Sequence, residues 1–243
     1  MTIFLDFPAG QFDAGVEFWR RVTGTTLSEL RGEHDEFATL LPDQGDAYLR
    51  VQRLGSGPAQ CHLDLHLDRA DLRPAFERAI ELGGTHVYRE AADVDVLTSP
   101  GGFPFCLVPA DDESQVPPPN RLVGLATTAR LDQLCLDIPP SRWDAETAFW
   151  PELTGWDLFG VDEPEFARLK QPENLPLRLL LQRLDEEAPA VTAHPDFAAP
   201  RSASVARAHT ELGARVVRVN EGWTVMADPL GRPYCLTGRP LVS

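Results

Sequence analysis

Apolar and polar positions follow a regular order through the first half of the chain. We interpret residues 3–7 (IFLDF) as a short strand. Apolar side chains then recur at helical spacing from Phe12 to Val22, and Gly24 stands where that helix should end. After this come, in order, strands at 37–42, 47–54 and 60–68, a helix from Leu72 to the pair Gly83-Gly84, and strands at 85–90, 93–99 and 103–109.

The opening stretch of the chain returns in the second half. LDFPAGQFDAGVEFWRRVTG (5–24) and LDIPPSRWDAETAFWPELTG (136–155) share nine of twenty positions. The match continues in order, because QRL (52–54) returns at 182–184 and PGGFPFCL (100–107) corresponds to PLGRPYCL (229–236). A period this long exceeds the roughly 20–50 residues of solenoid repeats, so we interpret it as the duplication of a whole domain.

The strand–helix–strands order occurs twice in each half, so it occurs four times in the chain. This order predicts an α+β architecture in which helices pack on strongly curved sheets. Between the halves lies ADDESQVPPPNRLVG (110–124), whose three consecutive prolines favour extended geometry and exclude a helix or a central strand. We therefore predict a first domain at 1–110, an acidic, Pro-rich linker at 111–128 and a second domain at 129–243.

The charge balance limits the kinds of partner. Lys and Arg number 22 against 37 Asp and Glu, which gives a net charge of −15. Such a surface repels phosphate backbones and anionic headgroups, so we expect neither nucleic acid nor membrane as a partner. We expect a small-molecule ligand and a chain that is a monomer or a homodimer.

The four cysteines indicate a reducing compartment. Cys61, Cys106, Cys135 and Cys235 lie in apolar, strand-like runs without CxxC spacing, which is typical of buried thiols. The first residues, MTIFLDFP, do not have the basic region and apolar core of a signal peptide. We therefore expect a cytoplasmic protein.

With these motifs in this order, the chain resembles the vicinal oxygen chelate superfamily of glyoxalases, bleomycin-resistance proteins and extradiol dioxygenases. The resemblance rests on FWRRVTG (18–24), FWPELTG (149–155), HLDLHLD (62–68) and the endings PGGFPFCL and DPLGRPYCL. It covers both halves and implies two tandem glyoxalase-like domains. In this fold each domain consists of two βαβββ modules whose curved sheets form a cup.

The resemblance also implies where a metal would be held. Metal-dependent members place a His on the first strand of a module and a Glu on its last strand. The corresponding first-strand positions here are Phe4, His62, Cys135 and His194, and the last-strand positions are Gln52, Cys106, Gln182 and Cys235. Because each half has one His and no carboxylate at these positions, we predict no metal ligands and no cofactor. A divalent metal held by the imidazole and a thiolate is the alternative.

The clearest candidate site lies in the first half. His62, Asp64 and His66 stand at i, i+2 and i+4, so a strand places all three on one face. We interpret His62 as a catalytic acid/base or ligand and Asp64 as the group that orients an imidazole. His66, Cys106 and Gln52 are then candidates for ligand binding. The alternative is a structural polar pair that neighbouring backbone groups satisfy, with Cys106 acting as a small hydrophobe.

A second, similar arrangement occurs at His194 and Asp196, which we also predict to bind ligand. Pro195 stands between them, and proline is expected to interrupt a strand ladder. We therefore place the working site in the first half and expect the second half to be scaffold or a drier pocket.

Three functional classes remain open. The first is a protein that binds a small organic molecule in one or both cups without metal. The second is a metal-dependent lyase, isomerase or dioxygenase. The third is a metal-free enzyme that uses His62 as a base. The first is the function we predict, and fold analogy by itself does not select among the three.

Overall fold

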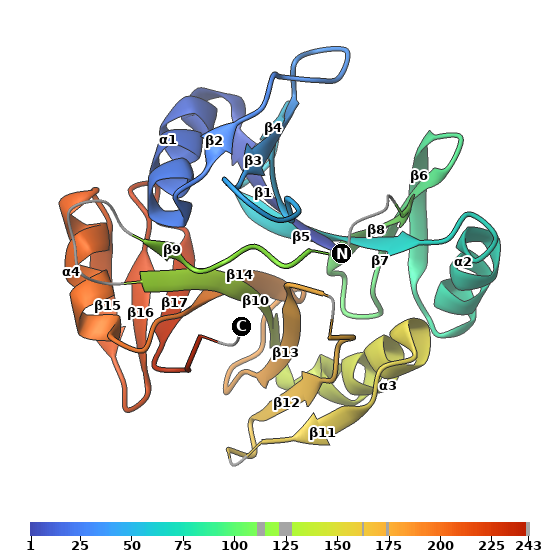
Figure 1. The fold of residues 1–243 in the computed structure, drawn as a ribbon. Coiled ribbons are helices and arrows are strands. Elements are labelled where there is room, and N and C mark those ends of the chain that lie inside the picture. The colour runs from blue at the N-terminus through green and yellow to red at the C-terminus, as the bar shows by residue number, and fades with distance from the viewer. Residues whose placement is uncertain (111–114, 122–127, 162, 174, 242–243) are drawn as a thin grey trace. The chain divides into compact units, whose positions relative to one another are not determined.

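The computed structural model describes residues 1–243 apart from 111–114, 122–127, 162, 174 and 242–243 (Figure 1). Its elements are, in order, β1 (Thr2–Pro8), η1 (Ala9–Gln11), α1 (Phe12–Thr23), β2 (Thr26–Leu27), β3 (Phe37–Leu41), β4 (Leu49–Leu54), β5 (Gln60–Leu67), α2 (Leu72–Glu81), β6 (Thr85–Ala91), β7 (Val94–Thr98), β8 (Pro104–Pro109), β9 (Asn120–Arg121), β10 (Thr128–Ile138), η2 (Pro140–Arg142), α3 (Trp143–Thr154), β11 (Leu158–Gly160), β12 (Phe166–Leu169), β13 (Arg178–Arg183), β14 (Thr192–Ala198), α4 (Ser202–Glu211), β15 (Arg215–Val219), β16 (Trp223–Ala227) and β17 (Pro233–Thr237). The helices and strands predicted for the first half are therefore present.

The strands belong to two sheets with the same connectivity. One has the order β2-β3-β4-β1-β5-β8-β7-β6, and the other has the order β11-β12-β13-β10-β14-β17-β16-β15, with β9 paired to β10. The β7–β8 and β16–β17 pairs are antiparallel, whereas β5–β8 and β14–β17 are parallel. This is the connectivity of βαβββ modules, so the predicted α+β class and the tandem duplication are confirmed.

The repeated segments 5–24 and 136–155 form the same local structure. A single 3-10 turn precedes α1 and α3, and both helices end at a glycine in the left-handed region, Gly24 at φ 65° and Gly155 at φ 70°. Only glycine adopts this backbone without strain from a Cβ atom. The paired tryptophans Trp19 and Trp150 are fully buried core residues.

The chain divides into two compact units that differ from the sequence halves. The first unit contains Met1–Ile3, Cys61–Ser114 and Leu134–Ala193, and the second contains Phe4–Gln60, Gln115–Gln133 and His194–Ser243. Each unit therefore takes one module from each half of the chain. The domain limits at 1–110 and 129–243 stay a prediction, and residues 111–114 and 122–127 of the expected linker lie outside the described residues.

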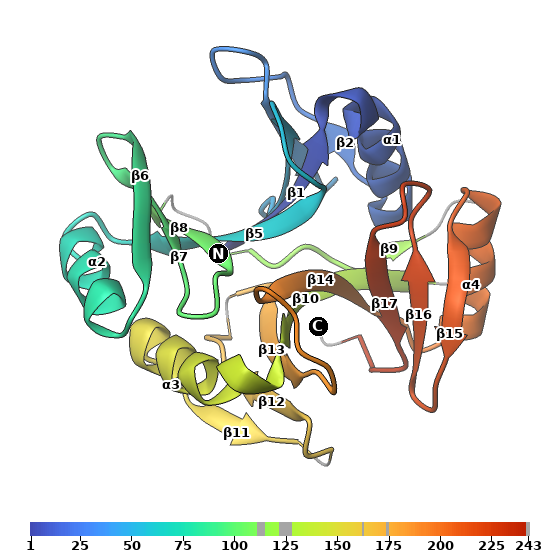
Figure 2. The same ribbon diagram turned by 180° about the vertical axis from the view of Figure 1, so that it is seen from behind.

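Helices cover the sheet strands within each unit. In the first unit α2 lies against β6 and β8 and also contacts α3. In the second unit α4 lies against β15, β16 and β17, as both views show (Figures 1 and 2). Phe197 and Tyr234 pack on Trp19 there, with ring centroids 6.3 and 5.4 Å from the indole.

Two further expectations concern the whole chain. All four cysteines are free thiols and are buried, as predicted. Among the helices of the described residues, none combines the length and the apolar character that crossing a bilayer requires.

Candidate functional site

The register of the parallel strands positions the candidate side chains. In the β5–β8 ladder Asp64 lies opposite Cys106, and in the β14–β17 ladder Asp196 lies opposite Cys235. Each histidine stands two residues before its aspartate, so it projects from the same face of the strand. The duplicated sequence therefore places an imidazole, a carboxylate and a thiol together twice.

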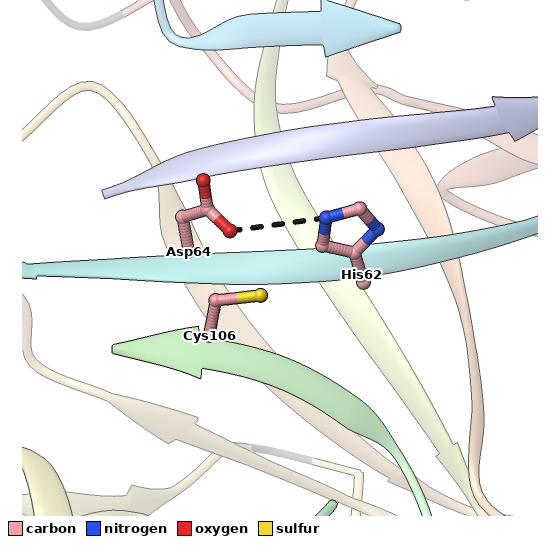
Figure 3. Close-up of side chains that lie close together, drawn as sticks. All are labelled: His62, Asp64 and Cys106. Carbon is pink, nitrogen blue, oxygen red and sulfur yellow. Dashed lines mark ion pairs between the residues drawn. The ribbon is translucent and has the colours of Figure 1, made fainter. Parts of the chain in front are cut away.

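In the first unit, His62, Asp64 and Cys106 form what we call the β5–β8 cluster (Figure 3). Each of the three offers a ligand atom, and these atoms lie within 4.8 Å of one another. The Nε2 atom of His62 lies 3.8 Å from Oδ1 of Asp64. Asp64 and Cys106 are buried, while the His62 side chain keeps 13% of its surface exposed. His62 is therefore the member of this cluster that solvent reaches most easily.

In the second unit, His194, Asp196 and Cys235 form the β14–β17 cluster, and all three are buried. Here the Nε2 atom of His194 lies 3.3 Å from Oδ1 of Asp196 and 3.5 Å from the sulfur of Cys235. The carboxylate is held from its other side, because Nε2 of Gln133 donates to Oδ2 of Asp196 at 2.6 Å. This cluster is slightly more buried than the β5–β8 cluster, because the His194 side chain is 11% exposed against 13% for His62. The placement of the working site in the first half stays a prediction.

Pro195 interrupts the ladder, as the sequence predicts, but it does not end the strand. Strand β14 runs through Pro195 from Thr192 to Ala198, although its parallel pairing with β17 covers only Asp196–Ala198. The equivalent pairing of β5 covers Leu63–Leu67. Proline removes a ladder donor but keeps an extended backbone, so it shortens the ladder and leaves His194 beside Asp196.

The remaining residues that the sequence singled out lie outside the two clusters. The Nε2 atom of His66 lies 3.1 Å from Oγ1 of Thr2, so this imidazole is hydrogen-bonded within the first unit. Gln52 lies on β4 in the second unit, opposite Phe37. The thiol of Cys135 donates to Oε1 of Gln182 at 3.6 Å, so these first-strand and last-strand positions are neighbours.

Gln133 is the residue that sequence reasoning missed. It is buried and stands two residues before Cys135 on β10, so it projects from the same face as that cysteine. Thr2 stands at the same distance before Phe4 in the first repeat. The sequence shows only that this position is polar in both repeats. The partner of Gln133 lies 63 residues away, and only the folded chain identifies it.

The comparisons with known proteins agree with this architecture. The family described as "Glyoxalase-like domain" matches residues 2–108 and again residues 133–237, which together are most of the chain. The chain belongs to the glyoxalase-like domain family. Its duplicated modules are those of the vicinal oxygen chelate superfamily. A search of curated proteins found no match.

Solved structures share the fold over almost the whole chain. A 2,2',3-trihydroxybiphenyl 1,2-dioxygenase from Sphingomonas wittichii has 15% identity and a TM-score of 0.64, covering 97% of this chain and 88% of its own. The Mn(II)-bound glyoxalase from Novosphingobium aromaticivorans has 14% identity and a TM-score of 0.65, covering 96% and 80%. The 2,3-dioxygenase LapB from Pseudomonas sp. KL28 has 15% identity and a TM-score of 0.65, covering 97% and 90%. At such low identity these likenesses concern the fold.

The donor chemistry of the clusters decides which ion they suit. Each cluster combines imidazole nitrogen, carboxylate oxygen and sulfur. Manganese favours oxygen ligands, whereas a thiolate favours zinc. Three protein ligands with one open position is a composition that zinc accepts. The clusters therefore do not fit a manganese ion of the kind bound by the glyoxalase neighbour, but their donors fit zinc.

Proposed function

We propose that the protein binds a small organic molecule at one or both clusters and does so without the metal site of its metal-dependent relatives. The observation that carries this proposal is the repeated pairing of a thiol with an aspartate, Asp64 with Cys106 and Asp196 with Cys235. In both units the thiol stands at the position where the superfamily resemblance implies a metal-binding glutamate. Because both repeats have a cysteine at the position where the resemblance implies a glutamate, we infer a function that does not use that glutamate.

The cluster geometry provides polar groups suited to an organic ligand. Buried polar groups are costly unless they are hydrogen-bonded, at about 1–3 kcal/mol for each unsatisfied group. The half-buried imidazole of His62, with the Asp64 carboxylate 3.8 Å away, can donate to or accept from a ligand. One neighbour of the same fold acts on 2,2',3-trihydroxybiphenyl, which is a small aromatic molecule with hydroxyl groups.

The experiment is a thermal-shift screen of metabolites and antibiotics, followed by titration of a hit with three variants. His62→Ala should weaken binding by about tenfold or more, which is the loss of one good polar contact worth about 1.4 kcal/mol. His194→Ala should have a much smaller effect because we place the working site in the first half. His86→Ala is the matched control, since His86 pairs with Asp95 on the partly exposed β6–β7 surface.

The variants also show how this proposal could fail. Loss of binding only in His194→Ala would move the site to the β14–β17 cluster. Equal binding by all three variants would place the ligand away from both clusters. A His62→Ala protein that no longer folds would support the structural interpretation of His62 and Asp64.

A metal-dependent lyase, isomerase or dioxygenase is the second candidate, favoured by the convergence of three donors in each cluster. If zinc were bound, His194, Asp196 and Cys235 would hold it, and Gln133 would orient the carboxylate. The ion would supply Lewis acidity. Elemental analysis of protein purified without added metal separates the two candidates, because stoichiometric zinc, iron, manganese or nickel that is lost in His194→Ala or His62→Ala would favour the second.

A further inference from the structure

Strands β11, β12 and β13 of the first unit have one buried face and one half-buried face (Figure 1). Alternate residues form the buried face, namely Ala167, Leu169, Leu179 and Leu181. The residues between them project to the other face, where Phe159, Arg168 and Leu180 are half-buried. None of these three residues belongs to either cluster.

These three half-buried side chains are direct neighbours across the strands. Arg168 lies opposite Phe159 in the β11–β12 ladder and opposite Leu180 in the β12–β13 ladder. Residues that lie directly opposite each other project from the same face, with their Cβ atoms about 4.5–5.5 Å apart. They therefore form what we call the Arg168 row, in which a cation lies between two apolar side chains.

The guanidinium of Arg168 is stacked on an aromatic ring. Its Cζ atom lies 4.6 Å from the centroid of the Phe159 ring. Within the part of the chain that the structure describes, its Nε atom has no hydrogen-bond partner, and no carboxylate forms an ion pair with the guanidinium. Stacking uses the flat face of a guanidinium and leaves the N–H groups in its plane for an acceptor.

Two other arginines with restricted exposure are bonded to oxygen atoms within the chain. Arg232 donates to the carbonyl of Gln60 at 2.7 Å, and Arg239 donates to Oδ1 of Asp132 at 2.7 Å. Removing a charge from water is costly unless a partner compensates for it. Since stacking alone compensates the Arg168 cation, an anion that reaches its N–H groups should be bound favourably.

The charged residues at the end of the β11–β12 ladder offset each other. Asp157 stands two residues before Phe159, and the N–H of Lys170 donates to its carbonyl at 2.9 Å. The carboxylate and the ammonium group are thus carried by neighbouring residues of opposite sign. Glu165 stands three residues before Arg168, so alternation directs it to the other face. The Arg168 row therefore keeps its positive charge.

The acidic residue on the neighbouring strand lies away from this row. Asp137 is on β10, and the carbonyl of the next residue, Ile138, accepts from the N–H of Leu184 at 2.8 Å. Leu184 is four residues after Leu180, which corresponds to roughly 13 Å along a strand. Strands β11, β12 and β13 themselves, with the sequences LFG, FARL and RLLLQR, contain no acidic residue.

We propose that the Arg168 row is a further binding site, which takes a small aromatic carboxylate. The planar guanidinium presents its N–H donors in a fork that matches a carboxylate, and the aromatic ring of the ligand packs on Leu180 and Phe159. Charge complementarity selects this occupant, because a cation between two apolar side chains matches one negative charge on an apolar body. The site shares no residue with the clusters, so it does not depend on the function proposed for them.

The test compares 4-fluorobenzoate with 4-fluorobenzamide, which have nearly the same shape and differ in charge, by ¹⁹F NMR titration of the full chain. The wild type should bind the carboxylate about tenfold more tightly than the amide, the effect of one charge-assisted contact. Arg168→Gln should remove this preference. Phe159→Leu should weaken 4-fluorobenzoate binding by about two- to fivefold, because it removes the ring on which the guanidinium is stacked.

A second substitution of the arginine does not depend on the folding of Arg168→Gln. Phe37 pairs with Gln52 and Phe166 pairs with Gln182, so Thr39 and Arg168, each two residues further on, occupy equivalent positions. Arg168→Thr therefore introduces the residue that the first repeat has in this ladder. It should also abolish the preference for the carboxylate.

Arg183→Gln is the matched control, because it removes the same charge from a neighbouring strand. Arg183 is exposed and stands three residues after Leu180, so alternation directs it to the other face. This variant should bind both probes as the wild type does. His62→Ala should do so too, which separates the Arg168 row from the β5–β8 cluster and its proposed function.

The measurements give a clear decision. Equal affinity of the wild type for the two probes, absence of binding, or a preference that persists in both Arg168 variants would overturn the proposal. A similar loss of 4-fluorobenzoate binding in Arg183→Gln or His62→Ala would also overturn it, because the ligand would then respond to overall charge or lie at the cluster. Loss of the preference in the Arg168 variants, with weaker binding in Phe159→Leu and unchanged controls, would support it.

Discussion

Trp150 donates its indole Nε1–H to Oε2 of Glu146 at 2.6 Å, one turn earlier on α3, and both side chains are fully buried. The other oxygen of Glu146 accepts from the backbone N–H of Gly101 at 2.6 Å. One carboxylate thus satisfies two buried donors, and burial raises the pKa of Glu146 above its usual value.

In the second unit a different carboxylate accepts from the equivalent indole N–H and backbone N–H. Trp19, the equivalent of Trp150, donates to Oδ2 of Asp228 at 3.0 Å, and Oδ1 of Asp228 accepts from the N–H of Leu230 at 2.9 Å. The repeat alignment pairs Asp228 with Ser99 and Glu146 with Gly15. The carboxylate that accepts from both donors therefore comes from helix α3 in the first unit and from the turn before β17 in the second unit.

The different positions of the two carboxylates predict how the stability of the first unit responds to substitutions at Glu146 and Ser99. Glu146→Gln should destabilise the protein by about 1–3 kcal/mol, because the amide NH2 that replaces one carboxylate oxygen cannot accept from the Trp150 or Gly101 donor that it faces. Ser99→Asp should restore part of the loss in that background, since the carboxylate then stands where Asp228 stands. Urea unfolding of the two single variants and the double variant measures the coupling.

Ser99→Asp in the wild-type chain is the control, because it brings a second carboxylate next to Glu146 and should destabilise. Ser99 already accepts from the N–H of Phe103, so the turn itself is kept. If the changes in the free energy of unfolding caused by Glu146→Gln and Ser99→Asp simply add in the double variant, a carboxylate at position 99 does not replace the one at position 146.

Gly15 should not tolerate a side chain, although it lies within a helix. A Cβ atom there would lie 2.4 Å from the Phe7 ring. Gly15→Ala should therefore cost about 1–3 kcal/mol by overpacking, against a gain of roughly 1 kcal/mol in helix propensity. Gly10→Ala is the matched control, since nothing lies within 4 Å of that position. Thermal unfolding of both variants checks this, and a stabilised Gly15→Ala would disprove the clash.

His209 should make stability depend on pH. Its Nδ1 lies 3.0 Å from the Tyr234 hydroxyl, and burial lowers its pKa to about 3. Because the unfolded chain takes up this proton near pH 6.5 and the folded chain does not, the contribution of His209 to stability is present above pH 6.5. It is lost as the pH falls toward 3, by up to about 1.4 kcal/mol per pH unit.

The measurement is the free energy of unfolding of the wild type minus that of His209→Gln, taken between pH 7.5 and pH 4. The difference cancels the titration of the carboxylates and should fall with decreasing pH. A constant difference would mean that His209 accepts a proton in the folded state.

The four thiols should react slowly in the folded protein. Cys61, Cys106, Cys135 and Cys235 are each no more than 9% exposed. A thiol reagent such as dithionitrobenzoate should therefore label all four rapidly in urea and only slowly in buffer. Rapid labelling of the native protein, or a disulfide seen by mass spectrometry without reductant, would contradict their burial as free thiols.

Local patterns were enough to predict the elements and the duplication. The spacing from Phe12 to Val22, the end at Gly24 and the alternation through His62 and Asp64 depend on neighbours in the chain, and the structure places them as predicted. Pro195 shortens the β14–β17 ladder, as its missing N–H requires, while the strand itself continues through it.

The partners of buried polar groups were decided only by the tertiary structure. Gln133 meets Asp196 across 63 residues, and Glu146 meets Gly101 across 45. The sequence by itself determined that the two halves carry the same modules, because repeated residues recur in the same order. It did not determine that each compact unit takes one module from each half, or that Pro117 and Arg130 line one cavity. These features depend on packing between segments distant in the chain, which the hydrophobic pattern of either segment does not encode.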